Sequence, residues 1–119
     1  MSNDRPVQVS FTERFEKEMR RLVKRYRHIQ LDIQPIIEQL QAGEIPGDQI
    51  PNLDHAVFKV RVRNTDIQKG KSGGYRVIYY LQTATQILLI TIYAKSDRSD
   101  IAAAEIREIL NRAEEDLEK

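Results

Sequence analysis

The chain of 119 residues has no cysteine, only two histidines and no apolar run of membrane-spanning length. The lack of cysteine excludes disulfides and thiolate metal sites. His28 and His55 do not stand in a metal-ligand spacing with each other or with nearby carboxylates, so we expect neither a metal nor another cofactor. The lack of a spanning segment and of a charged-then-apolar leader predicts a cytoplasmic protein without a membrane partner.

The length and the 40% apolar content predict one domain over residues 1–119. Two separate cores in a chain of this size would each be marginally stable. The sequence also has no internal repeat and no low-complexity tract. We therefore expect one modest core.

Charge is unevenly distributed along the chain, although the net charge is only +1. The window from Lys59 to Arg98 holds eight basic and two acidic residues, so it carries +6 while the remainder carries −5. Like charges gathered on a folded surface repel each other, and such a patch usually has a polyanionic partner. Nucleic acid is the first candidate.

The N-terminal part predicts a short strand around Val7 and Val9, followed by two helices. Ser10 and Glu13 have the spacing of a capping box at the start of the first helix. Its apolar stripe, at steps of three and four residues, consists of Phe11, Phe15, Met19, Leu22, Val23 and Tyr26. Asp32 is the predicted cap of the second helix, with Pro35 in its first turn and a stop at Gly43. These stripes predict an antiparallel helix pair.

Three strands are predicted after a connector rich in proline and glycine, over residues 57–63, 75–81 and 87–93. In the first strand, apolar residues alternate with Lys59, Arg61 and Arg63, so one face is apolar and the other cationic. Ser99 is the predicted cap of a last helix that begins at about Asp100. The expected fold is α+β: a small antiparallel sheet with the two N-terminal helices on one face, a C-terminal helix, and a cationic groove on the opposite face.

Two long segments carry a resemblance to a known family. They are K-V-R-V-R-N-T-D-I-Q-K-G-K-S-G-G-Y-R-V-I-Y-Y-L at 59–81 and I-T-I-Y-A-K-S-D-R-S-D-I at 90–101. With this order of elements, the chain resembles the RelE/ParE superfamily of bacterial toxins, and within it the HigB-type branch of RelE toxins. The resemblance implies a toxin that cleaves messenger RNA, usually on the translating ribosome. It also implies a cognate antitoxin protein as partner.

The resemblance assigns catalytic positions to Lys59, Arg61, Arg76 and Lys95. Cleaving RNA without a metal needs a base for the 2′-hydroxyl, cations for the charge on the phosphorane, and an acid for the leaving oxygen. A lysine can act as the base when its charged form is destabilised, whereas arginine suits phosphate binding. RelE has an arginine and a tyrosine where this chain has Ser96 and Ala102, which leaves the general acid unassigned.

Further contacts to RNA are predicted for five side chains of the basic window, namely Arg63, Lys69, Lys71, Tyr93 and Arg98. Tyr93 offers a ring on which a base can stack, or a phenolic proton. Each feature also has a structural alternative. The alternating cations can be a solvated strand face, Arg76 can pair with Asp97 or Asp100, and Tyr93 can be packing.

Two other functions remain open at this stage. A ParE-like inhibitor of DNA gyrase shares the fold without needing a nuclease site. A non-catalytic nucleic-acid-binding module is the other alternative. The combination of Arg76 with Lys59 and Arg61 favours the nuclease.

Overall fold

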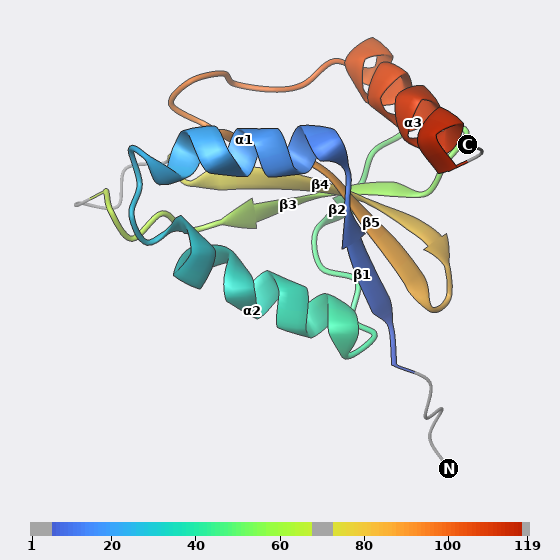
Figure 1. Cartoon of the computed structure of the whole chain (residues 1–119), viewed down its shortest axis with the longest axis horizontal. Coiled ribbons are helices and arrows are strands. Elements are labelled where there is room, and N and C mark those ends of the chain that lie inside the picture. Colours follow the sequence, from blue (N-terminus) through green and yellow to red (C-terminus); the bar gives the residue numbers. More distant parts are fainter. Residues whose placement is uncertain (1–5, 68–72, 118–119) are drawn as a thin grey trace.

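The computed structural model describes residues 6–67 and 73–117, so the predicted RNA contacts Lys69 and Lys71 lie outside the described residues. Within those ranges the order of elements is β1 (Gln8–Phe11), α1 (Glu13–Val23), α2 (Ile29–Gln41), β2 (Asp48–Gln49), β3 (Val57–Val62), β4 (Tyr75–Thr83), β5 (Gln86–Ala94) and α3 (Ala103–Leu117). Figure 1 shows α1 and α2 side by side along the sheet, with α3 set apart near one end. The predicted α+β class is confirmed.

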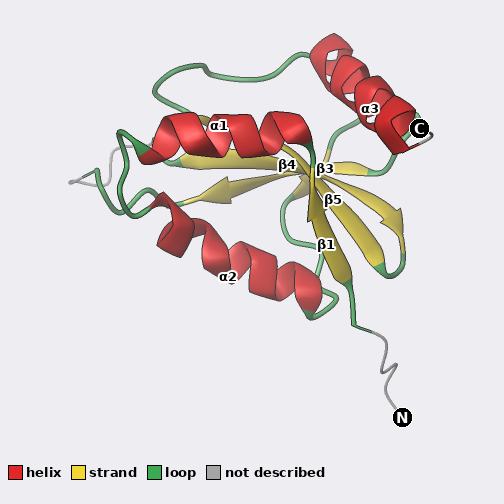
Figure 2. Ribbon diagram, in the orientation of Figure 1, coloured by secondary structure: helices red, strands yellow, loops and turns green. Residues whose placement is uncertain are grey.

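The strands form one sheet in the order β1-β5-β4-β3-β2. Its centre is the predicted antiparallel unit of β3, β4 and β5, which is confirmed. The sheet is larger than predicted, because β1 adds to β5 in parallel and the two residues of β2 add to β3. Figure 2 shows that the strands splay apart with the usual twist.

The first core cluster lies between the sheet and the two N-terminal helices. The apolar stripe of α1 contributes Phe15 and Leu22, and α2 contributes Ile29, Ile33 and Leu40. The apolar face of β3 contributes Val60 and Val62, as the alternation predicted. Burying these side chains stabilises the fold by about 1.5–3 kcal/mol each.

The second core cluster lies on the opposite face of the sheet, beneath α3. Ile106, Ile109 and Leu110 of α3 pack there against a strand surface that includes Val57, Ile78, Ile90 and Tyr93. This helix therefore covers part of the face on which the cationic groove is predicted. The two clusters account for the apolar stripes of all three helices.

The predicted helix starts are wrong at three positions, where contacts with other parts of the fold compete with the local signal. Thr12, not Ser10, caps α1: its Oγ1 accepts the Phe15 N–H at 2.9 Å and donates to the Ile90 carbonyl at 2.7 Å. Ser10 is occupied in β1, opposite Leu88.

The other two starts are displaced in opposite directions. Helix α2 begins at Ile29, one turn before the predicted cap, and the extra turn buries Ile29 completely. Asp32 lies inside α2 and accepts hydrogen bonds from Thr65 N and Oγ1 instead. Helix α3 begins at Ala103 rather than near Asp100, whose carboxylate accepts the Ile101 N–H at 2.8 Å.

Candidate nucleic-acid interface

The strand register places Arg61 directly opposite Arg76, and Arg76 directly opposite Tyr93. Directly opposed residues on neighbouring strands point to the same face of a sheet. This face is the one that carries Ile78 and the α3 contacts, and it lies opposite the core formed with α1 and α2. The register thus brings two arginines, 15 positions apart in the sequence, side by side.

Lys59 lies on the same strand face, two residues before Arg61 and diagonal to Arg76. The residue directly opposite Lys59 on β4 is Ile78. The Lys59 Nζ atom donates to Asp100 Oδ1 at 3.0 Å. Lys59 thus lies near Arg76, as predicted, and it pairs with Asp100, which is not among the predicted site residues.

Arg63 and Lys95 lie one residue beyond the ends of β3 and β5, on either side of Gly74. The Lys95 N–H donates to the Gly74 carbonyl at 2.9 Å. Gly74 has φ +72°, and a Cβ atom there would lie 2.5 Å from the Val62 carbonyl oxygen. Only glycine fits this close approach, so Gly74 holds the two chain ends, and their basic residues, together.

These five residues, Lys59, Arg61, Arg63, Arg76 and Lys95, are called the basic cluster below. Arg61 and Arg63 are exposed, Lys59 and Lys95 are half-buried, and Arg76 is 8% exposed. Within the described ranges Arg76 has no acidic partner, and its guanidinium donates to the Gly73 and Tyr75 carbonyls at 3.2 and 3.3 Å. Pairing of Arg76 with Asp97 or Asp100 is therefore not what the structure shows.

Tyr93 is buried, with 6% of its surface exposed, and its ring belongs to the core beneath α3. Arg98 covers the ring, with the guanidinium carbon 5.4 Å from the ring centroid. The structure thus shows the packing alternative, and the predicted stacking surface for RNA bases has no free face. Burial, followed by the nearby charge of Asp100, raises the pKa of Tyr93.

Arg98 is held by Glu105 of α3, so this predicted RNA contact is already paired. Its Nη2 donates to Glu105 Oε1 at 2.8 Å, and Arg14 of α1 donates to Glu105 Oε2 at 2.6 Å. Asp97, in the same connection between β5 and α3, pairs with Arg25. The predicted role of Arg98 in binding RNA therefore requires that an ion pair open.

No pattern in the sequence marks Asp100 or Glu105 as part of the site. Both belong to the segment from 97 to 105, where three carboxylates pair with cations of other elements. The one signal in the sequence is that Asp97 lies at the end of the basic window and that Asp100 and Glu105 follow it. Lys59 is 41 residues away from Asp100 in the sequence, and Arg14 is 91 residues away from Glu105. Both separations are beyond the reach of local patterns.

Over the described residues, no three His, Asp or Glu side chains gather closely enough to hold a metal ion.

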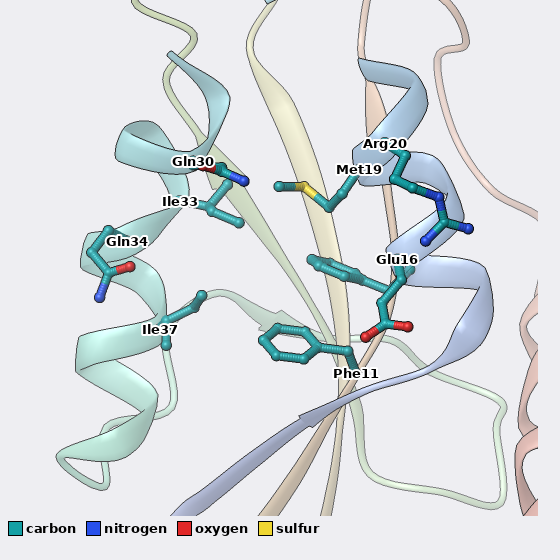
Figure 3. Close-up of a pocket in the computed structure, with 9 residues that line it drawn as sticks. Phe11, Glu16, Met19, Arg20, Gln30, Ile33, Gln34 and Ile37 are labelled. Carbon is teal, nitrogen blue, oxygen red and sulfur yellow. The ribbon is translucent and has the colours of Figure 1, made fainter. Parts of the chain in front are cut away.

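A groove of about 510 Å³ lies away from the basic cluster, between α1 and α2. Figure 3 shows Phe11, Met19, Ile33 and Ile37 facing into it. None of the predicted site residues lines this groove. In the same described ranges, no helix is long and apolar enough to cross a bilayer.

Comparison with known proteins identifies a family. No curated protein matches the chain. A family model described as the RelE toxin of the RelE / RelB toxin-antitoxin system matches residues 10–118, which include every element of the fold from α1 onward and all five residues of the basic cluster. The chain therefore belongs to the RelE family of toxins of toxin-antitoxin systems.

Proposed function

We propose that this toxin is an endoribonuclease that cleaves messenger RNA on the ribosome, without a metal ion, and so inhibits translation. The observation that carries the proposal is the opposition of Arg61 and Arg76 on one sheet face, with Arg76 free of acidic partners among the described residues. Two guanidinium groups held side by side repel each other, and an RNA phosphate between them relieves that repulsion.

The basic cluster supplies the charge stabilisation that phosphoryl transfer requires. Arg76 is anchored at a strand start and is nearly buried, so it is the best-positioned group for the scissile phosphate. Preorganised donors of this kind stabilise a developing phosphorane without further rearrangement. Arg61, Arg63 and Lys95 are placed around it to hold the flanking RNA backbone.

Lys59 is proposed to contact phosphate. In the free protein its Nζ atom donates to the Asp100 carboxylate, and the same donor suits an oxygen of an RNA phosphate. The sequence-based hypothesis that Lys59 is the general base stays a prediction, which requires that Lys59 leave Asp100 and accept a proton.

The function is tested by adding the purified protein to a cell-free translation reaction and, separately, to a DNA gyrase supercoiling reaction. We expect translation to stop and cut mRNA to accumulate, while supercoiling continues. The fragments should end in 2′,3′-cyclic phosphates, because the attacking group is the RNA's own hydroxyl. Inhibition of supercoiling with intact mRNA would instead establish the gyrase inhibitor. Loss of cleavage on chelation, with ribosomes still assembled, would overturn the metal-independent mechanism.

Membership in the family also implies a cognate antitoxin as partner. We propose that the antitoxin supplies an acidic, amphipathic segment that covers or distorts the basic cluster, because acidic side chains relieve its self-repulsion. Expression of the toxin alone should then arrest growth, and co-expression with the antitoxin should restore it. Normal growth of cells that express a high level of the toxin alone would contradict the toxin function.

A further inference from the structure

Asp100 places a carboxylate at the edge of the basic cluster. Its Oδ1 atom accepts the Ile101 N–H at 2.8 Å and the Lys59 ammonium at 3.0 Å. The Asp100 backbone carbonyl accepts the Arg98 Nε–H at 3.0 Å, which fixes the connection on the other side. A carboxylate is thus built into the position that an RNA phosphate would need in order to contact Lys59.

The groups around Asp100 favour its charged form. The Ile101 N–H and then Lys59 lower the pKa of Asp100, and Lys59 is its ion-pair partner. The Tyr93 hydroxyl is buried, and the Asp100 carboxylate is near enough to raise the pKa of Tyr93 beyond the effect of burial. The cluster is therefore partly neutralised from within.

The Lys59–Asp100 pair is exposed enough to exchange its partner. The Asp100 side chain is 66% exposed and the Lys59 side chain 35%, whereas Glu105, which holds Arg98, is 26% exposed. Exposed ion pairs contribute little net stability, because water and salt screen both charges. An incoming phosphate can take Lys59 from Asp100 without disturbing the core.

We propose that Asp100 is an internal counter-ion of Lys59 that RNA phosphate must displace, so that it sets how tightly the basic cluster binds RNA. This inference rests on the proposed function, since it takes RNA as the ligand. In the free toxin the carboxylate lowers the attraction of the cluster for any polyanion. On binding, a phosphate of the RNA backbone replaces it at Lys59, and Asp100 turns to solvent.

The inference is tested with Asp100→Asn, which removes the charge and keeps an oxygen that can accept the Ile101 N–H. The matched control is Asp97→Asn, the same change in the same connection, at a pair with Arg25 on another part of the molecule. The probe is a short single-stranded RNA with 2′-O-methyl riboses, which cannot be cleaved by its own hydroxyl. Binding is measured by fluorescence anisotropy over a range of salt concentrations.

We expect Asp100→Asn to lower the Kd by about two- to fivefold at low salt, the range that an exposed ion pair supports. The slope of log K against log salt should become steeper, by at most about 0.7, the contribution of one phosphate contact in a single strand, because the Lys59 contact then forms without first breaking an internal ion pair. Asp97→Asn should leave the slope close to that of the unchanged protein. In a Lys59→Met background, Asp100→Asn should lose its effect, since the two residues act through one contact.

Three results would overturn the inference. Equal effects of Asp100→Asn and Asp97→Asn would show that net charge alone is responsible. Weaker binding by Asp100→Asn would show that the carboxylate holds Lys59 in place for RNA instead of competing with it. An effect of Asp100→Asn that persists without Lys59 would place its action elsewhere. If the unchanged protein does not bind the free RNA, the inference is overturned, whereas the proposed function is decided separately by cleavage in the cell-free translation reaction, so the two failures are distinguished.

Discussion

Arg76 illustrates how a single side chain takes its role from its neighbours. Its guanidinium lies at a strand start, 8% exposed, and donates to two backbone carbonyls. Carbonyl acceptors orient an arginine without cancelling its charge, whereas a carboxylate would orient it and also neutralise its charge. The side chain is therefore fixed and still positively charged toward its opposed neighbour Arg61.

At this scale we predict that Arg76→Ala reduces the rate of RNA cleavage by about a hundredfold or more, because it removes a preorganised donor to the transition state. RNA binding should fall much less. The measurement is single-turnover cleavage together with Kd for the uncleavable RNA. Arg112→Ala, an exposed arginine of α3, is the control and should change neither. Cleavage at the normal rate by folded Arg76→Ala would remove Arg76 from the site.

The chain segment that enters β4 determines the geometry of the basic cluster. Gly74 brings its backbone against the Val62 carbonyl of β3, and its own carbonyl accepts the Lys95 N–H at the end of β5. The ends of three strands therefore meet at one glycine, with Arg63 and Lys95 on either side.

An alanine in the left-handed conformation costs about 1 kcal/mol by itself. We predict that Gly74→Ala lowers the free energy of unfolding by more than this amount. A Cβ atom 2.5 Å from the Val62 carbonyl oxygen forces the strands apart. Gly43→Ala is the control, since Gly43 has φ +92° but nothing within 4 Å of its Cβ position. Urea unfolding measures both variants, and equal losses of stability would show that the close approach to β3 is unimportant.

Ion pairs link distant parts of the chain, and those of the half-buried Glu105 are expected to contribute more to stability than the exposed Lys59–Asp100 pair. Glu105 of α3 pairs with both Arg98 and Arg14, and Asp100 pairs with Lys59. Arg98 and Arg14 lower the pKa of Glu105 below the ordinary glutamate value of 4.5, and the Ile101 N–H and Lys59 lower the pKa of Asp100 below the ordinary aspartate value of 3.8. His28 lowers the pKa of Asp66 in the same way, through its backbone and ring N–H groups.

These carboxylates predict a stability that falls in acid. A group whose pKa is lower in the folded state stabilises the fold fully above its unfolded pKa, and the contribution disappears as the pH falls through the folded pKa. Urea unfolding should therefore show a loss of stability that starts below about pH 4.5, the ordinary pKa of a glutamate. Glu105→Gln should reduce stability at neutral pH and make the acid loss smaller.

The control for this prediction is Glu108→Gln, an exposed position of the same helix. It should leave both the neutral stability and the acid loss close to those of the unchanged protein. An acid profile of Glu105→Gln that parallels the unchanged protein would show that the links from α3 to Arg14 and Arg98 do not contribute to stability.

Features that repeat over short distances are predictable from the sequence. The alternation around Lys59, Arg61 and Arg63 predicted an apolar and a cationic strand face, and the antiparallel unit of β3, β4 and β5 is confirmed. The segregated charge and the two long motifs indicated the family that the comparison confirms. Such patterns are readable because side-chain direction in a strand or helix follows residue spacing alone.

Tertiary structure decided which of these residues meet. The capping box at Ser10 was locally plausible, but pairing of β1 with β5 moved the helix start to Thr12. Asp100 reaches Lys59 across 41 positions, and Tyr93 is buried because α3 packs over its ring. Contacts of this kind depend on how whole elements pack against each other, and neither propensity nor periodicity within a short window contains that information.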